Sequence, residues 1–477
     1  MEGFSRRTET PGVRATVVAR KRRNGRGAKG SRKVETMTDR TTETAEVLET
    51  ANTTGILPTR WGWVDAAIWT ARMLTALENG VQGGKWYSLM DKVVTRKTLE
   101  GAFTQVKTNG GAAGVDHVGI EQFAGKKEEN LEKLEQALRE GSYRPQGVRR
   151  VWIPKAGSKE KRPLGVPTVR DRVVQAALVK VLEPIFERDF AEHSYGFRPR
   201  RGCKDALRRV DELLREGYAW VVDADLKSYF DTIPHRKLME QVGEKIADGA
   251  VLDLIEGFLR AKVMETAEGW TPEAGTPQGA VLSPLLSNLY LNPLDQKMAG
   301  EGHEMVRYAD DFVVLCRSQA EAEQVLGKIQ EWTAQAGLKL HPIKTRIVNA
   351  NETGGFDFLG YHFEQGRKWP REKSLKKLKD SIRDKTRRSH GQSMAMIITK
   401  LNATLRGWFE YFKHSRSQTF PSLDSWIRMR LRSILRRRAG RDGRGRGLDH
   451  NRWPNVFFAQ QGLFSLAQAH ARARQPS

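Results

Sequence analysis

Residues 306–318 read VRYADDFVVLCRS and place two adjacent carboxylates, Asp310 and Asp311, between two apolar runs. Short apolar runs rich in β-branched residues predict buried strands, so the acidic pair is expected at the tip of a β-hairpin. An acidic tip is often only a solvated turn. Adjacent like charges beside buried strands repel each other, however, and need solvent, a basic side chain or a metal ion as compensation. A hard divalent cation such as Mg²⁺ favours carboxylate oxygens and keeps open positions for water and phosphate.

A second acidic strand supplies a candidate third carboxylate. The stretch GYAWVVDADLKSYFD carries Asp223, Asp225 and Asp231. Along an extended strand Asp223 and Asp225 face the same side, whereas Asp231 lies well beyond them. Asp225 ends the apolar run, where a ligand at the edge of a sheet is expected. A lone Asp there could cap a turn or a helix, but together with Asp310 and Asp311 it favours a shared cation site. A pocket occluded by a salt-bridged lysine would leave that site without a mechanism.

The charge of the chain indicates a polyanionic partner. The 477 residues carry a formal net charge of +24 at pH 7, and the basic residues cluster in RKRRNGRGAKGSRK, RKWPREKSLKKLKDSIRDKTRR and IRMRLRSILRRRAGRDGRGR. Clustered positive charge predicts nucleic-acid binding with little sequence preference and strong salt dependence.

Cysteine usage and hydropathy suggest a reducing compartment. Neither of the two cysteines, Cys203 and Cys316, lies in a CxxC pair, which argues against a zinc site or a disulfide framework. No apolar run approaches the length of a membrane span, and no secretory segment follows the start. We expect a cytoplasmic protein without a membrane partner.

Strand and helix patterns alternate irregularly along the chain. Apolar spacing predicts helices over residues 61–80, 89–107, 173–190, 280–299 and 320–338. Strands are predicted over 148–155, 217–226, 338–348 and 356–363, besides the acidic hairpin. Strands mixed with helices, without a regular βαβ repeat, predict an α+β sheet with helices on one face.

Nine motifs in fixed order carry a resemblance to a known family. They are GAAGVD, IPKAGSKEKRPLGVPTVRDRVVQ, HSYGFRPRRGCKDAL, DLKSYFDTIPH, GTPQGAVLSPLLSNLYL, VRYADDFVV, LKLHPIKTRIV, FDFLGYHF and LRGWFEYF. Over roughly residues 85–475 the chain resembles a group II intron-encoded reverse transcriptase/maturase. The resemblance implies an α+β right-hand polymerase, with an antiparallel palm sheet packed on helices and an all-helical thumb.

The resemblance also implies a domain layout. The part that resembles the family is preceded by a basic and polar arm over 1–55, which matches nothing in the family and whose composition predicts disorder. An N-terminal helical extension and the start of the fingers are expected over 56–140. Fingers and palm are expected over 141–365, a helical thumb or maturase domain over 366–440, and a basic C-terminal tail over 441–477 that can pack back onto the thumb. Many relatives carry a C-terminal HNH endonuclease with cysteine pairs. This chain ends soon after FFAQQGLFSL without them, so we expect no DNA cleavage.

The catalytic roles implied by the resemblance fall on the acidic motifs. Asp225, Asp310 and Asp311, with the backbone carbonyl of Leu226, are expected to hold two Mg²⁺ ions. These ions lower the pKa of the primer 3′-hydroxyl and steady the triphosphate and the leaving pyrophosphate. Lys344 in HPIKT matches a lysine that protonates pyrophosphate, although a plain surface lysine remains the alternative.

The nucleotide contacts implied by the resemblance lie in other motifs. Lys155 and Arg162 are expected to grip the triphosphate, with a solvated basic loop as the alternative. Phe230 is expected beneath the incoming sugar, where it leaves no room for a 2′-hydroxyl. Gln278 is expected to contact that sugar, and Gly279 to let the backbone approach the nucleotide.

The segment NATLRGWFEYFKHS resembles the maturase region. The spacing of Trp408, Tyr411 and Phe412 fits the core face of a helix better than an RNA-binding face. Contacts with phosphates and 2′-hydroxyls of folded RNA are expected from basic side chains instead. These are Arg406, Lys413, Arg428, Arg430 and Arg432.

The function implied is RNA-directed DNA polymerisation by two-metal-ion phosphoryl transfer. The expected partners are deoxynucleotides, an RNA template, a DNA primer or DNA target, and the parent group II intron RNA, whose splicing and retrohoming the protein assists. Two alternatives stay open. One is a splicing-only maturase with a vestigial polymerase centre. The other is a domesticated reverse transcriptase of a retron, a diversity-generating element or a phage-defence system.

Overall fold

The computed structural model describes residues 60–154, 161–265, 269–389 and 391–475. The predicted arm over 1–55 and the predicted nucleotide ligand Lys155 lie outside these residues. Within them, no helix is both long enough and apolar enough to cross a bilayer.

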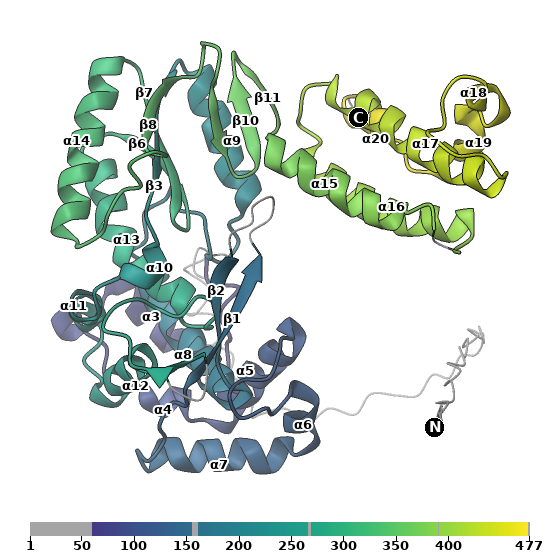
Figure 1. Ribbon diagram of the computed structural model, residues 1–477. Coiled ribbons are helices and arrows are strands. Elements are labelled where there is room, and N and C mark those ends of the chain that lie inside the picture. Colours follow the sequence, from purple (N-terminus) through teal and green to yellow (C-terminus); the bar gives the residue numbers. More distant parts are fainter. Residues whose placement is uncertain (1–59, 155–160, 266–268, 390, 476–477) are drawn as a thin grey trace, which may run out of the picture. The chain divides into compact units, whose positions relative to one another are not determined.

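A four-stranded antiparallel sheet forms the palm (Figure 1). Its strands run in the order β6-β7-β3-β8, with β3 at Trp220–Asp225, β6 at Glu304–Tyr308, β7 at Asp311–Cys316 and β8 at Arg346–Asn349. The hairpin β6–β7 is the acidic hairpin expected from the sequence, and β3 is the predicted acidic strand.

Successive side chains on the central strands β3 and β7 point alternately into two hydrophobic cores, so both faces of the palm sheet are buried. Val222 on β3 and Phe312 on β7 belong to the core that includes helices α13 (Ser283–Gly300) and α14 (Gln319–Gln335). Residues one position away, such as Val221 and Val313, belong to a second core with α9 (Cys203–Arg215). Because side chains alternate, residues of odd number on β3 and β7 share the α9 face. Helices therefore cover both faces of the sheet, and not one face as the pattern suggested.

A small antiparallel sheet follows the palm and extends the α9 core. It has the strand order β11-β10-β9, with β9 at Phe356–Phe358, β10 at Tyr361–Glu364 and β11 at Arg367–Pro370. Leu359 and Gly360 both have positive φ, the backbone of a two-residue hairpin turn, so the segment predicted as one strand is two. Strand β11 lies inside the segment expected to be all helical, whose first helix, α15 (Glu372–Lys385), begins after it.

The fingers contain a third sheet, of strand order β2-β1-β4-β5. Its strands are β1 (Val148–Pro154), β2 (Lys161–Val166), β4 (Val263–Met264) and β5 (Gly269–Trp270). The helices of this part of the chain are α3 (Ala71–Asn79), η1 (Gln82–Gly84), α4 (Met90–Val93), α5 (Arg96–Asn109), α6 (Ile120–Gly125), α7 (Lys127–Arg139), α8 (Val169–Glu187), α10 (Tyr229–Thr232), α11 (His235–Lys245) and α12 (Gly249–Leu259).

Threonine caps correct two predicted helix boundaries. The helix predicted from Trp61 begins only at α3, because the Thr70 hydroxyl accepts a hydrogen bond from the backbone N–H of Met73. The helix predicted over 89–107 is divided into α4 and α5 by the N-cap of Thr95. Residues 338–345 are also not the predicted strand: apart from one bridge between Leu226 and Leu340, they form a turn that ends at β8.

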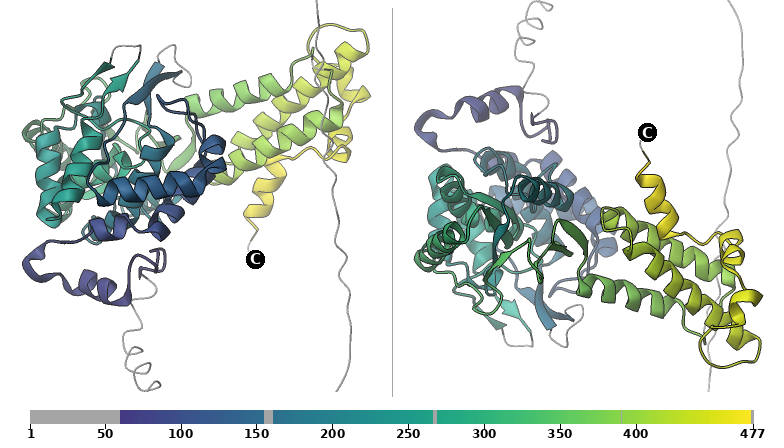
Figure 2. Two further views of the ribbon diagram at one scale, coloured as in Figure 1. Left: turned by 90° about the horizontal axis from the view of Figure 1, so that it is seen from below. Right: turned by 90° about the horizontal axis from the view of Figure 1, so that it is seen from above.

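The thumb consists of helices α15, α16 (Met394–Phe412) and α17 (Thr419–Arg438), which lie alongside one another in both views of Figure 2. The predicted tail contains α18 (Asp449–Arg452), α19 (Asn455–Gln460) and α20 (Leu466–Ala473), and its residues Phe458 and Leu466 pack in the core of the thumb helices. The buried carboxylate of Asp424 on α17 accepts hydrogen bonds from the N–H groups of Leu466 and Ala467, which fixes the start of α20.

Candidate active site

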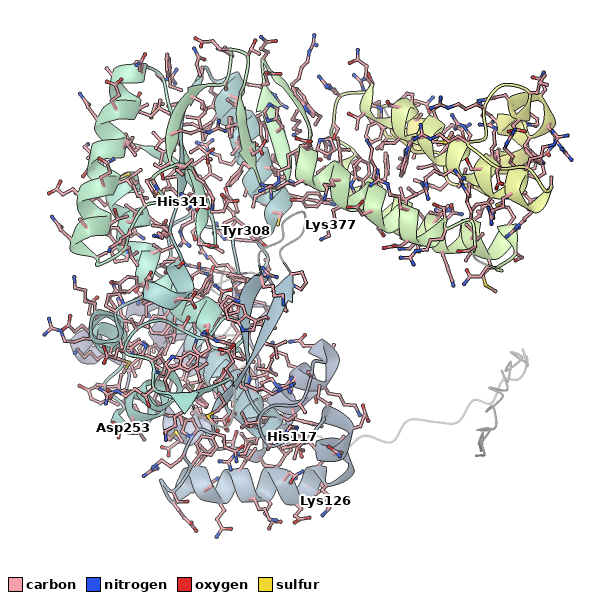
Figure 3. All side chains as sticks on the ribbon, viewed as in Figure 1. His117, Lys126, Asp253, Tyr308, His341 and Lys377 are labelled. Atoms are coloured by element: carbon pink, nitrogen blue, oxygen red, sulfur yellow. The ribbon has the colours of Figure 1, made fainter. Side chains whose placement is uncertain are left out.

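Asp225 and Asp311 lie directly opposite each other in the antiparallel pair β3–β7. Both positions are odd in the alternation described above, so both side chains project on the α9 side of the sheet. Tyr308 pairs with Asp311 across the hairpin, which leaves only Ala309 and Asp310 in the turn. The fold therefore sets Asp225 opposite Asp311, with Asp310 next to them in the turn. Figure 3 labels Tyr308 on this hairpin and His341 on the segment whose N–H binds the Asp225 carbonyl.

The turn of the hairpin is strained and buttressed. Ala309 has φ +61° and is buried, at a position of a two-residue turn where glycine is usual. Gly196 packs against it so closely that a Cβ on Gly196 would lie 2.2 Å from the Ala309 nitrogen. Ser194 extends this support, since it forms a parallel bridge with Arg307 of β6.

A buried arginine beneath the hairpin fixes the turn from below. The fully buried Arg307 guanidinium pairs with Asp295 on α13, with Nε at 2.8 Å from Oδ1. Its Nη1 donates to Asn288 Oδ1 at 2.9 Å and to the Ala309 carbonyl at 2.8 Å. The amide of Asn288 in turn donates to the Gly196 carbonyl at 2.7 Å. Charge-assisted bonds of this kind hold a buried network rigid when all members are satisfied.

Burial and mutual repulsion disfavour charge on the hairpin carboxyls. Burial, with repulsion from Asp223 and Asp310, raises the pKa of Asp311 to about 7. Burial and the nearby charge of Asp225 raise the pKa of Asp310. Burial also raises the pKa of Asp223 to about 6, although Arg346 opposes that shift from 3.3 Å. Among the described residues neither Asp310 nor Asp311 forms an ion pair.

Lys344 lies on the third carboxylate. Its Nζ is 2.8 Å from Oδ2 of Asp225, and the two side chains are 58% and 41% exposed. The predicted proton donor therefore stands at the site, but in contact with a predicted metal ligand. Exposed pairs of this kind contribute only about 0–1 kcal/mol, so the lysine can leave at little cost.

The carboxylates of Asp225, Asp310 and Asp311 are the kind of ligand that a hard cation binds, although they do not converge on one point. In the part of the chain that the structure describes, no three His, Cys, Asp or Glu side chains converge as a ready metal cluster. Two half-buried carboxyls with raised pKa and no ion pair among the described residues nevertheless leave negative charge that a divalent cation would compensate. The Leu226 carbonyl points away from residues 339–341, because the neighbouring Asp225 carbonyl and Lys227 N–H both bind that segment.

Phe230 lies on the short helix α10, after a left-handed Ser228. Its ring is half-buried and packs edge-on against the buried Tyr229, with ring centroids 5.4 Å apart. The Phe230 carbonyl accepts a hydrogen bond from Thr276 at 2.6 Å, and Gly275 has φ +92° where a Cβ would strike the backbone of Asp231. The loop before Gln278 thus fixes the position of Phe230.

The glycine expected to face the nucleotide has a second role. A Cβ on Gly279 would lie 2.7 Å from the Gly165 carbonyl, and the Gln278 carbonyl binds the Gly165 N–H at 2.7 Å. The close approach is therefore between this loop and strand β2 of the fingers. Arg162 is exposed on that strand, paired with Ile153 of β1.

Two family models match the chain. Residues 153–363 match the reverse transcriptase (RNA-dependent DNA polymerase) model, and residues 375–453 match the maturase-specific domain of group II introns. Protein YkfC of Escherichia coli is 35% identical, over 52% of this chain and 74% of its own length. The chain belongs to the group II intron-encoded reverse transcriptases.

Other relatives of this reverse transcriptase are longer. The group II intron-encoded protein LtrA of Lactococcus lactis is 43% identical over 35% of this chain, and the match spans 28% of LtrA. An uncharacterized 91 kDa protein in a cob intron of Schizosaccharomyces pombe is 31% identical over 48% of this chain and 35% of its own length. A partial Cas6-RT-Cas1–Cas2 complex has a chain with 23% identity and a TM-score of 0.33, over 52% of this chain and 41% of that one, a similarity too low to support an argument.

The five basic side chains predicted to contact RNA differ in exposure and in their hydrogen bonds. Arg432 is buried and donates to the Trp453 carbonyl and to Asn455, so its prediction as an RNA contact was wrong. The Arg430 guanidinium donates hydrogen bonds to the side-chain hydroxyl and to the backbone carbonyl of Thr386. Arg406 is exposed, whereas Lys413 and Arg428 are half-exposed.

Sequence reasoning missed the supports of the hairpin. Arg307, Asp295, Asn288 and Gly196 carry no catalytic signature, and Gly196 lies 92 residues before Asn288 in the sequence. One signal was present: an arginine inside an apolar strand requires a buried acidic partner.

Proposed function

We propose that this protein copies RNA into DNA with deoxynucleotides, at a site built on Asp225, Asp310 and Asp311. The observation that supports this most is the register of β3 and β7, which sets Asp225 opposite Asp311 beside a turn held by Arg307. A rigid hairpin with two carboxyls that form no ion pair among the described residues can bind the divalent cations that accompany a nucleoside triphosphate.

Asp225, Asp310 and Asp311, with the Leu226 carbonyl, would hold two Mg²⁺ ions. When bound, the ions lower the pKa of the primer 3′-hydroxyl and neutralise the charge that develops on the triphosphate. Release of Lys344 from Asp225 Oδ2 frees that oxygen and the ammonium group at the same time. The lysine then becomes available to donate its proton to the leaving pyrophosphate.

The remaining side chains orient the nucleotide. Arg162 on the exposed edge of the fingers offers a forked donor set for phosphate, and Lys155 is proposed to join it. Phe230 would lie under the sugar and exclude a 2′-hydroxyl, with Gln278 at the same sugar. Gly279 would keep the loop close to the fingers strand while the nucleotide binds beside it.

Binding of the parent intron RNA is the second part of the proposal. The maturase-specific match over 375–453 and the basic clusters of the thumb support it. We assign the RNA contacts to Arg406, Lys413 and Arg428, whose side chains reach the surface. Such contacts would make RNA affinity fall steeply with salt.

One experiment tests both parts. Primer extension on an RNA template should proceed with deoxynucleotides and fail when Asp310→Ala and Asp311→Ala are combined. Phe230→Val should raise ribonucleotide incorporation by about ten- to a hundredfold, because the pocket gains room for a hydroxyl. Splicing of the flanking intron RNA should survive the aspartate changes. Undiminished extension by the double variant would refute the assigned site, and no extension by the wild type would favour a splicing-only protein.

A further inference from the structure

Phe197 is an exposed aromatic residue in an unfavourable backbone conformation. Its side chain is 48% exposed and its φ is +57°. The left-handed region is sterically poor for a bulky residue, and an exposed ring returns little burial energy. Residues held in this way persist only where the surrounding structure imposes the conformation, and they cluster at functional sites.

The residues around Phe197 impose its conformation. Arg198, which follows it, is buried and binds Glu187 through Nε at 2.9 Å and Nη2 at 2.8 Å, and the Ser194 carbonyl at 2.7 Å. Gly196, which precedes it, is locked against Ala309 and held by Asn288. Both neighbours of Phe197 are therefore fixed inside the protein, and the ring between them is presented to solvent.

The ring is presented beside the catalytic hairpin. The ring centroids of Phe197 and Tyr308 are 6.5 Å apart, and Tyr308 is two residues before Asp310. The loop continues with the basic residues Arg200, Arg201 and Lys204. An exposed apolar ring in a basic loop matches the chemistry of a nucleic-acid chain, whose bases and sugars stack on aromatic rings while basic groups meet its phosphates.

From this placement we infer that Phe197, together with Tyr308, binds the base-paired end of the primer–template by contact with a base or sugar face. The contact is independent of sequence, because every base offers an apolar face. It holds the primer end at Asp310 without taking part in the chemical step. The inference rests on the proposed polymerase function, but the binding it describes can be measured without catalysis.

The discriminating variant is Phe197→Gly. Glycine removes the ring and also relieves the left-handed φ, so the melting temperature should stay unchanged or rise. Fluorescence anisotropy with an RNA template annealed to a labelled DNA primer, without nucleotides, should show the Kd raised about tenfold. That ratio should be the same at 50 and 200 mM salt, because no charge is lost. In extension assays the KM for primer–template should rise, with kcat and the KM for deoxynucleotides within about twofold.

Two further variants complete the test. Phe197→Trp should bind the primer–template like the wild type, since it restores an aromatic face. Tyr87→Ala removes another exposed aromatic residue, 63% exposed, and should leave the Kd unchanged. An unchanged Kd of Phe197→Gly for the primer–template would overturn the inference and indicate that the exposed ring contacts another partner, such as a protein. A clear fall in its melting temperature would also overturn it. If the wild type fails to extend primers but Phe197→Gly still weakens duplex binding, the proposed function fails and the inference stands.

Discussion

Gly196 and Ala309 are in backbone contact, although 113 residues separate them in the sequence. The loop that contains Gly196 supports the turn of the acidic hairpin directly, since a methyl group at Gly196 would lie 2.2 Å from the Ala309 nitrogen. The backbone conformation of the hairpin thus depends on a residue without any chemical function of its own.

The first prediction concerns this contact. Gly196→Ala should displace the turn, lower the free energy of unfolding by about 1–3 kcal/mol and reduce polymerase activity at least tenfold, because backbone atoms cannot move aside as a flexible side chain can. Gly243→Ala on α11 is the matched control. Its added methyl would meet nothing within 4 Å, so stability should be unchanged or rise by up to about 1 kcal/mol. Denaturant unfolding and primer extension measure both effects, and equal behaviour of the two variants would contradict the contact.

The second prediction concerns the buried arginine. Arg307→Met should destabilise the protein by about 3–5 kcal/mol, because Asp295 would remain buried without its partner. Adding Asp295→Leu should restore most of the stability but not the activity, since the Ala309 carbonyl would still lack its donor. Arg236→Met, at an exposed pair with Glu240, should change stability by less than about 0.5 kcal/mol. Full activity in the double variant would show that the network only stabilises the fold.

The third prediction follows from the pKa of Asp311, raised to about 7. A carboxyl with a raised folded-state pKa contributes stability below its ordinary value of 3.8 and loses it as pH rises through the folded value. The metal-free protein should therefore lose stability between about pH 4 and 7, whereas Asp311→Asn should lose less. At pH 8 the variant should be more stable by roughly 2–4 kcal/mol and should respond less to Mg²⁺. Thermal unfolding with and without Mg²⁺ measures this, and identical pH profiles would contradict the assigned burial.

The fourth prediction separates the two roles of Lys344. Lys344→Met frees Asp225 Oδ2, so the apparent affinity for Mg²⁺ should rise slightly. The chemical step should slow by about 10²–10⁴-fold, because the proton donor is lost. Single-turnover incorporation across a Mg²⁺ titration measures both quantities. A variant that loses Mg²⁺ affinity and keeps its rate would show that the lysine only orders the carboxylate.

Sequence reasoning succeeded where a local pattern determines the structure. The apolar runs around Asp310 and the strand that ends at Asp225 predicted two strands whose register partners are the candidate ligands. Sequence reasoning failed where the structure depends on contacts between residues that are far apart in the sequence. Strand β11 exists because Tyr361–Glu364 pairs with it, and the tail folds because Asp424 caps α20. The burial of Arg432 depends on Trp453 and Asn455, which lie beyond its helix and which the pattern of that helix does not reveal.

The central claim is that Asp225 acts with the hairpin carboxylates, and the rate of single-deoxynucleotide incorporation on an RNA template tests it most directly. Asp223 is the matched control, because it lies two residues away on the same strand face and pairs with Arg346, whereas Asp225 pairs with Lys344, the proposed proton donor. At saturating Mg²⁺, Asp225→Asn should lose at least about 10³-fold in rate, from the loss of metal-ion stabilisation of the transition state, while Asp223→Asn should stay within about tenfold of the wild type. Equal losses in both variants, or a wild-type rate in Asp225→Asn, would contradict the account.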